Sequence, residues 1–147
     1  GNGTFLPPTA SATGPSPNSV AAAALNGDNR LDLVVANYDA NNISVLFNAG
    51  NGTFPTQSSY PSDSQPETVA LVDLNNDNRT DMLVTNYGAN TLSIYFNAGN
   101  GTFQNYTTIA TGSLPSVATA ADVNGDQKLD LVYITIGGNR VGVYLQC

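Results

Sequence analysis

Two nine-residue stretches carry acidic and amide side chains at a spacing that suits a bound cation. They read DLNNDNRTD from Asp73 to Asp81 and DVNGDQKLD from Asp122 to Asp130. Each places side-chain oxygens at its first, third, fifth and ninth positions, the pattern of a short loop wrapped around a hard cation. Three carboxylates in one such loop would repel one another without a cation. Because the sequence contains no histidine and the ligands are all oxygens, the spacing predicts Ca²⁺.

The expected ligands are four side chains and one backbone carbonyl in each loop. They are Asp73, Asn75, Asp77, the Arg79 carbonyl and Asp81, and then Asp122, Asn124, Asp126, the Lys128 carbonyl and Asp130. A plain Asn- and Asp-rich turn with solvated acids is the alternative for any single copy. Two full copies in the same context favour the calcium interpretation.

A third version of the stretch, ALNGDNRLD, runs from Ala24 to Asp32 and lacks the first carboxylate. It keeps Asn26, Asp28, the Arg30 carbonyl and Asp32, but Ala24 stands at its first position. Calcium affinity follows the number of charged ligands. We therefore expect a weak or vacant metal site in this loop.

The three loops recur because the whole chain repeats. The pentapeptide GNGTF begins at Gly1, Gly50 and Gly99, so the period is 49 residues and the 147 residues hold three units, 1–49, 50–98 and 99–147. A period of this length is typical of propellers and other repeat arrays. The proline- and serine-rich stretches take equal places in the period, so we interpret residues 1–147 as a single three-blade unit without an internal domain boundary.

Each unit has the pattern of four short strands separated by turn residues. Those expected in the second unit are 68–74 before the loop, 82–86 after it, 91–97 and 102–109, and the innermost strands of the other units are expected at 20–25 and 117–123. Four short strands per unit match one blade of a β-propeller. The sequence therefore predicts an all-β fold of three four-stranded antiparallel blades.

The motifs also carry a family resemblance. The DxNxDxxxD loop, the LxV strand that follows it, the NYxAN turn and GNGTF together resemble FG-GAP and VCBS repeats, the blades of propellers like that of the integrin α-subunit. The resemblance implies a calcium ion in the loop between the first and second strands of a blade, on one rim. It also implies roles in cell adhesion, ligand recognition or, as in some fungal lectins, sugar binding.

Three blades are fewer than the roughly four to eight that complete a propeller ring. The segment GNGTFLP has the sequence of a fourth strand, and Val141–Gln146 reads as a third strand with no fourth after it. We expect a homodimer in which the N-terminal strand of one chain completes the last blade of the other, which gives six blades. The alternative is that this chain is the remainder of a longer propeller.

Composition narrows the function classes. A net charge of −7 with four basic residues argues against nucleic-acid binding, and no apolar run is long enough for membrane insertion. Six Asn-Xaa-Ser/Thr sequons suit an extracellular or secreted protein, whose signal is not present in this chain. Without histidine, and with Cys147 as the single cysteine, no catalytic constellation is evident, so we expect no enzymatic activity.

The function expected from these observations is a calcium-binding module for extracellular adhesion or protein recognition. A calcium-stabilised lectin is the alternative, because aromatic rings beside amides can bind sugars. The candidate ligand-binding residues are Asn37, Tyr38, Asp39, Asn86 and Tyr87. A fragment of a larger propeller with a purely scaffolding role is the second alternative.

Overall fold

A computed structural model describes residues 2–147, which form an all-β fold of antiparallel strands. The strands are β1 (Pro17–Ala23), β2 (Asp32–Asn37), β3 (Asn42–Phe47), β4 (Thr56–Pro61), β5 (Pro66–Val72), β6 (Asp81–Asn86), β7 (Thr91–Tyr95), β8 (Thr107–Ala110), β9 (Pro115–Ala121), β10 (Asp130–Thr135) and β11 (Arg140–Tyr144). Within this range no helix has the length and apolar character needed to cross a membrane.

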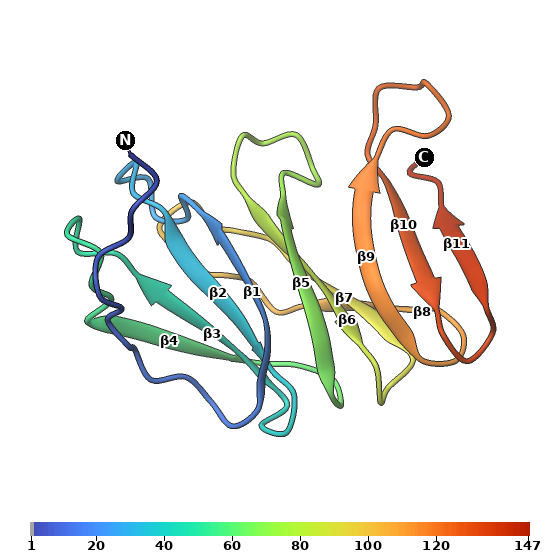
Figure 1. Cartoon of the computed structure of the whole chain (residues 1–147). Coiled ribbons are helices and arrows are strands. Elements are labelled where there is room, and N and C mark those ends of the chain that lie inside the picture. The colour runs from blue at the N-terminus through green and yellow to red at the C-terminus, as the bar shows by residue number, and fades with distance from the viewer. Residues whose placement is uncertain (1) are drawn as a thin grey trace.

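The strands form three sheets that lie in a row along the chain (Figure 1). The first two sheets have four strands, in the orders β1-β2-β3-β4 and β5-β6-β7-β8, and the third has the order β11-β10-β9. Every neighbouring pair is antiparallel. The predicted propeller-type blades are confirmed, and we call the sheets the first, second and third blades.

The strand boundaries differ from the prediction at the first, third and fourth strands of a blade. The third strand of the second blade ends at Tyr95 and not at residue 97. The innermost strands begin two or three residues earlier, at Pro17, Pro66 and Pro115, each directly after a residue with a left-handed backbone. That left-handed residue, rather than the apolar run, ends the preceding turn. The fourth strand of the second blade is only Thr107–Ala110, because Phe103 forms an isolated bridge with Asn97 and turns inward before the strand begins.

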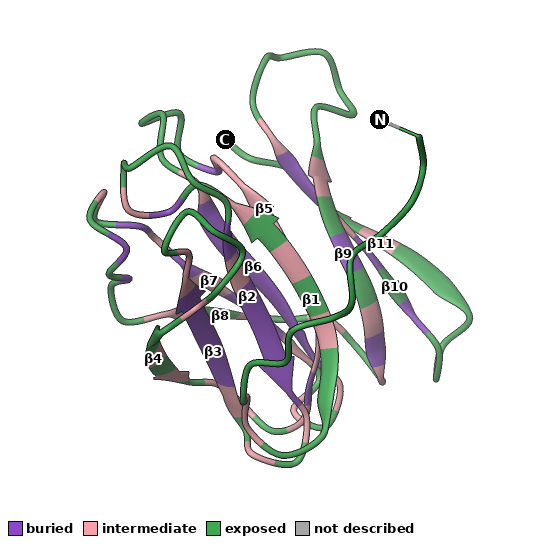
Figure 2. Cartoon of the chain, turned by 60° about the vertical axis from the view of Figure 1, so that its left-hand side comes forward, coloured by how far each residue is buried: buried purple, intermediate pink, exposed green. Residues whose placement is uncertain are grey.

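The third blade lacks the fourth strand that the others have. Within the described residues the segment 2–16 forms no strand, so the strand predicted from GNGTFLP does not form in the single chain. The physical reason is topological, because the open edge on β11 belongs to the blade at the far end of the row (Figure 1). β11 is accordingly mostly exposed, as Figure 2 shows, whereas its neighbour β10 is largely buried.

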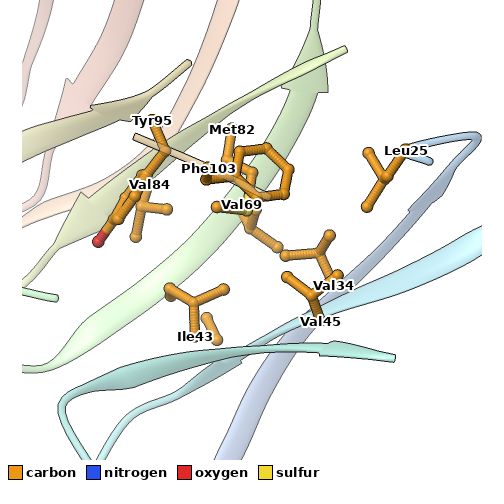
Figure 3. Close-up of a cluster of buried hydrophobic side chains, with 10 residues drawn as sticks. Leu25, Val34, Ile43, Val45, Val69, Met82, Val84, Tyr95 and Phe103 are labelled. Carbon is orange, nitrogen blue, oxygen red and sulfur yellow. The ribbon is translucent and has the colours of Figure 1, made fainter. Parts of the chain in front are cut away.

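Two apolar clusters hold the blades together. The first lies between the first and second blades and contains Val34, Val45, Val69 and Met82, with the Phe103 ring beside Met82 and Val69 (Figure 3). The second lies between the second and third blades and includes Leu74, Leu83 and Leu131. Contacts between strands β1 and β5, and between β5 and β9, run along the same two joints. The core therefore sits between blades as well as within them.

Candidate functional site

The three candidate metal loops connect the first and second strands of each blade, at the upper end of the row in Figure 1. Their backbones share one conformation, because the fourth and sixth loop residues are left-handed in every copy. These residues are Gly27 and Asn29, Asn76 and Asn78, and Gly125 and Gln127. Glycine and asparagine tolerate this region best. The loop with Ala24 therefore keeps the same fold as the two complete loops.

In the second loop the polar side chains bond to the loop's own backbone. Asp73 accepts hydrogen bonds from the N–H groups of Asp77 at 3.1 Å and Asn78 at 2.7 Å. Asn75 Oδ1 accepts from Asp77 N at 3.1 Å, and Asp77 Oδ1 accepts from Arg79 N at 2.9 Å. The Asp73, Asn75 and Asp77 side chains are thus held inside one small loop, in which Asp73 is half-buried while Asn75 and Asp77 are exposed to solvent.

The third loop repeats this arrangement. Asp122 Oδ1 accepts from Gly125 N at 2.6 Å and Asp126 N at 3.2 Å, and Oδ2 accepts from Gln127 N at 2.8 Å. These bonds, led by the one from Gln127, lower the pKa of Asp122. Asn124 and Asp126 bond as their counterparts do, and Asp126 Oδ1 accepts from Lys128 N at 2.9 Å. Asp122 is therefore held in the ionised form that a calcium ligand needs.

The first loop lacks only the contribution of its first residue. Asn26 Oδ1 accepts from Asp28 N at 3.1 Å, and Asp28 Oδ1 accepts from Arg30 N at 2.9 Å. Ala24 has no side-chain oxygen, so no carboxylate takes the place of Asp73 or Asp122. The Arg30 guanidinium also lies 3.9 Å from Asp28 Oδ2 at the surface. This loop has fewer anionic ligands to offer than the other two.

The ninth loop residue is the buried end of each loop. Asp32, Asp81 and Asp130 are fully buried. Asp81 Oδ2 accepts from Leu74 N at 3.0 Å and Oδ1 accepts from Asn97 N at 2.9 Å, so this carboxylate ties the loop to the end of the third strand. Asp32 and Asp130 make the same pair of bonds, to Leu25 and Asn48 and to Val123 and Gln146.

Asp81 is a buried carboxylate without a cationic side chain. Burial raises its pKa, and repulsion from Asp77 and Asp73 adds to this, while the two N–H bonds act in the opposite direction. The one ion pair among residues 2–147 joins Arg30 to Asp28. Buried charges in proteins are normally paired or coordinate a metal. The environment of Asp81 is therefore compatible with a nearby cation.

The donor chemistry fits calcium, although the side chains do not surround a common point. Within residues 2–147 no three carboxylate, histidine or cysteine side chains gather in the manner of a closed metal cage. The reason is that the carboxylates turn toward backbone N–H groups, and Asn75 Nδ2 lies 3.2 Å from Asp77 Oδ2. Asp73, Asn75, Asp77, Asp81 and the Arg79 carbonyl are the residues that would hold the ion, with an amide and a carbonyl beside the acids.

The predicted ligand-binding residues lie at the opposite rim and divide into two groups. Tyr38 and Tyr87 come from neighbouring blades, and their ring centroids are 6.3 Å apart with planes tilted by 46°. They line a shallow hollow together with Ser16, Pro17, Asn18, Glu67 and Ile136. Burial, followed by the Glu67 charge, raises the pKa of Tyr38. The structure therefore brings the two tyrosines together.

Asn37, Asn86 and Asp39 do not line this hollow. Asn37 and Asn86 are fully buried in the second strands of their blades. Their amide nitrogens donate within the sheet, Asn37 to Asn42 and Ser44 and Asn86 to Thr91 and Ser93, while their Oδ1 atoms have no partner. Asp39 accepts a hydrogen bond from Ser16.

Glu67 and Asn18 line the hollow but were not predicted as ligand-binding residues. They hold the same place in the period, and the next residue in that place is Ser116. Asn18 Nδ2 donates to the Glu67 carbonyl at 3.2 Å, and Ser116 Oγ donates to Glu67 Oε1 at 3.4 Å. The signal in the sequence was a polar residue repeated one step after the proline that opens each innermost strand.

Comparisons with known proteins agree with this architecture. The family model described as an FG-GAP-like repeat matches residues 25–84 and 73–133. Each match starts in or next to a candidate metal loop and ends in the second strand of the following blade. No curated protein matches the chain significantly. The repeats of this family are typically parts of non-enzymatic propeller modules. Because the two matches span well over half of its residues, the chain belongs to the FG-GAP-like repeat family.

Proposed function

We propose that this protein is a calcium-binding, non-enzymatic propeller module for extracellular adhesion or protein recognition. The observation that carries the proposal is the pair of complete loops that end on buried carboxylates, Asp81 and Asp130, neither of which forms an ion pair with another described residue. Each loop presents further acids, Asp73 and Asp77 or Asp122 and Asp126, on the same short segment. A divalent cation would offset this concentration of negative charge.

The role of calcium in this proposal is structural. Asp81 already links its loop to the end of β7 through Asn97 N, and Asp130 links its loop to Gln146 N. An ion held by these acids would fix the loop to the first two strands of the blade. When its ligands close around it, such an ion is a stabiliser rather than a Lewis acid. It would keep one rim of the module rigid for contact with a partner.

The number of bound ions tests this proposal. Isothermal titration of the metal-free chain with Ca²⁺ should show two strong sites per chain. Asp73→Ala and Asp122→Ala should each remove one strong site and leave the other unchanged. Asp28→Ala is the matched control, because the same change in the first loop should leave both strong sites in place. Absence of binding in the unmodified chain, or loss of a strong site in Asp28→Ala, would contradict the assignment.

The hollow at the opposite rim favours a carbohydrate ligand as the second candidate function. Two tilted tyrosine rings stand beside the Glu67 carboxylate and the Asn18 amide, a combination of apolar faces and hydrogen-bonding groups that suits a sugar. We expect any sugar found on a glycan array to bind less to Tyr38→Ala and Tyr87→Ala. Because the hollow is remote from the loops, binding should persist in chelator at temperatures where the fold is intact. Absence of binding to any glycan would favour a protein partner or a scaffold.

A further inference from the structure

Phe103 is the side chain that closes the joint between the first and second blades. It follows the Asn100-Gly101-Thr102 turn, is 9% exposed, and packs edge-on against the Tyr60 ring with centroids 5.4 Å apart. The Tyr60 hydroxyl donates to the Gly101 carbonyl at 3.3 Å. Figure 3 shows the Phe103 ring within the cluster that also contains Met82 and Tyr95. The GNGTF turn thus carries an aromatic side chain onto the preceding blade.

The joint between the second and third blades has a cavity at the corresponding place. The cavity is about 260 Å³, and it is lined mainly by apolar side chains. Four residues of its wall have counterparts 49 residues earlier in the chain, within or against the apolar cluster of the first joint that contains Phe103. The wall residues are Leu74, Phe96, Ile109 and Tyr144, and their counterparts are Leu25, Phe47, Tyr60 and Tyr95. The two joints are otherwise built alike, since Asn97 Nδ2 donates to the Leu25 carbonyl and Gln146 Nε2 donates to the Leu74 carbonyl. Among the described residues, the second joint has no counterpart of Phe103.

The chain carries a matching phenylalanine that contacts nothing. Phe5 ends the first GNGTF copy and is 97% exposed. Its turn is already formed, because Asn2 Oδ1 accepts bonds from Thr4 N at 3.2 Å and Thr4 Oγ1 at 2.7 Å. Asn100 accepts the same two bonds from Thr102, and Gly3 and Gly101 are both left-handed. Phe5 is therefore presented on the same turn as Phe103, but without a neighbouring blade.

We propose that Phe5 of a second copy of this chain fills the cavity at Phe96, Ile109 and Tyr144, and that the two copies do this reciprocally. The N-terminus of the chain lies beside the first blade, at the other end of the row from the third blade (Figure 1). The second blade separates these two ends, so the chain does not fill its own cavity. Two reciprocal contacts would close the assembly without leaving a cavity of this kind at either junction.

The open edge of β11 would accept the segment that follows Phe5. In the second blade β8 pairs with β7 in the register Thr91–Ala110 to Ile94–Thr107. The same register on β11 pairs Arg140 with the partner's Ala12 and Val143 with the partner's Thr9. Pro7 and Pro8 would precede the paired residues, where the missing N–H of proline does no harm. An exposed strand edge, with Val141 at 67% exposure, is a surface that proteins normally cover.

A hydrogen bond that joins consecutive blades points to the same partner. Asn41 Oδ1 accepts from Gln65 N at 2.7 Å, and Asn90 Oδ1 accepts from Leu114 N at 2.7 Å. Asn139 holds the same place in the third blade and has the same left-handed backbone, but within the described residues its Oδ1 accepts no such bond. Gln65 and Leu114 stand 49 and 98 residues after Ser16, so Ser16 holds the same place in the period. The partner's Ser16 N–H would therefore supply the third bond of this series.

The first test measures assembly with a matched pair of variants. By light scattering after size exclusion, the unmodified chain should be a dimer at micromolar concentrations. Phe5→Ala should raise the dimer dissociation constant at least a hundredfold, since loss of a buried phenylalanine is costly. Leu6→Ala is the control, because Leu6 is 90% exposed. Its counterparts Pro55 and Gln104, which follow the other two GNGTF turns, are also exposed. A monomeric unmodified chain, or equal effects of the two variants, would overturn the proposal.

The second test traps the contact chemically. Ala49 and Ala98 donate backbone N–H bonds to Thr53 O and Thr102 O across the turn, and Cys147 holds the next place in this series. The partner's Thr4 would then face Cys147 at about 5.5 Å between Cα atoms, within the range for a disulfide. Thr4→Cys should give a disulfide-linked dimer in mild oxidant and a monomer band after reduction. Thr53→Cys is the control, because Thr53 lies in the same kind of turn but is already bonded to Ala49 within its own chain. It should crosslink no more than the unmodified chain. Equal crosslinking of the two variants, or a ladder of higher oligomers, would overturn the two-copy assembly.

Discussion

Replacing Ala24 with aspartate should give the first loop the carboxylate that the other two loops have. Ala24 is exposed, so the larger side chain meets no packing constraint. The left-handed residues Gly27 and Asn29 already set the backbone that the complete loops use. The variant therefore changes the ligand set of the loop while its fold is already in place.

The size of the effect follows from the second loop. There Asp73 accepts two backbone N–H bonds, and the new aspartate would accept the same two from Asp28 and Asn29. Each such bond contributes about 0.5–1.5 kcal/mol to the unfolding free energy. Repulsion of the new carboxylate by Asp28 and Asp32 acts against this stabilisation. Without calcium the change in unfolding free energy should thus be close to zero. With calcium at about 100 times the dissociation constant, binding would add about 2.7 kcal/mol, or roughly 5–10 °C in melting temperature.

Calorimetric titration and thermal melts, each with and without chelator, provide the assay. Ala24→Asp should bind one more calcium ion per chain than the unmodified protein and should gain thermal stability in calcium alone. Ala24→Asn is the matched control, since it adds a side chain of similar size with one acceptor oxygen for a loop N–H group but adds no charge. An unchanged ion count, or equal stabilisation of Ala24→Asp in chelator and in calcium, would refute the reasoning.

Three further predictions concern stability. Asp81→Asn should lower the unfolding free energy by about 1–3 kcal/mol even in chelator, because one of its two bonded backbone N–H groups would face an NH₂ group, and urea unfolding measures this. Burial raises the pKa of Tyr95, so above pH 10 the unfolded chain loses a proton that the folded chain keeps. The unfolding free energy should therefore fall by up to about 1.4 kcal/mol per pH unit in this range. Urea melts measure this slope, and Tyr95→Phe should flatten it. Phe103→Ala should cost about 3–5 kcal/mol of folding free energy by urea unfolding, whereas Phe5→Ala should cost the monomer almost nothing.

The sequence predicted the repeat architecture well because the evidence for it is local and periodic. The GNGTF turns and the DxNxDxxxD loops fix the backbone through residues that tolerate left-handed conformations, and these signals recur every 49 residues. The antiparallel blades follow from the short strands between them. The presence of calcium in the loops stays a prediction.

The sequence did not predict which polar side chains are buried or where a cavity forms. Asn37 and Asn86 follow apolar strands and read as surface amides, yet both are enclosed by the strands on either side of them. The sequence indicates that Asp81 is the ligand at the ninth position of the loop. Its bond to Asn97 N, 16 residues later, depends on where the third strand of the blade ends. The cavity at Phe96 and Ile109 arises where two blades meet, and no single segment encodes it.

The three-stranded third blade also determines where local unfolding of the protein begins. With an exposed β11 edge and a cavity in its joint, this blade has less buried apolar surface to lose than the first two. Local unfolding starts where such contacts are fewest. In the monomer, amide protons of β10 and β11 should therefore exchange with solvent through a low-energy opening that leaves β2 and β6 protected. The same C-terminal hairpin is where a protease would first cleave the folded monomer.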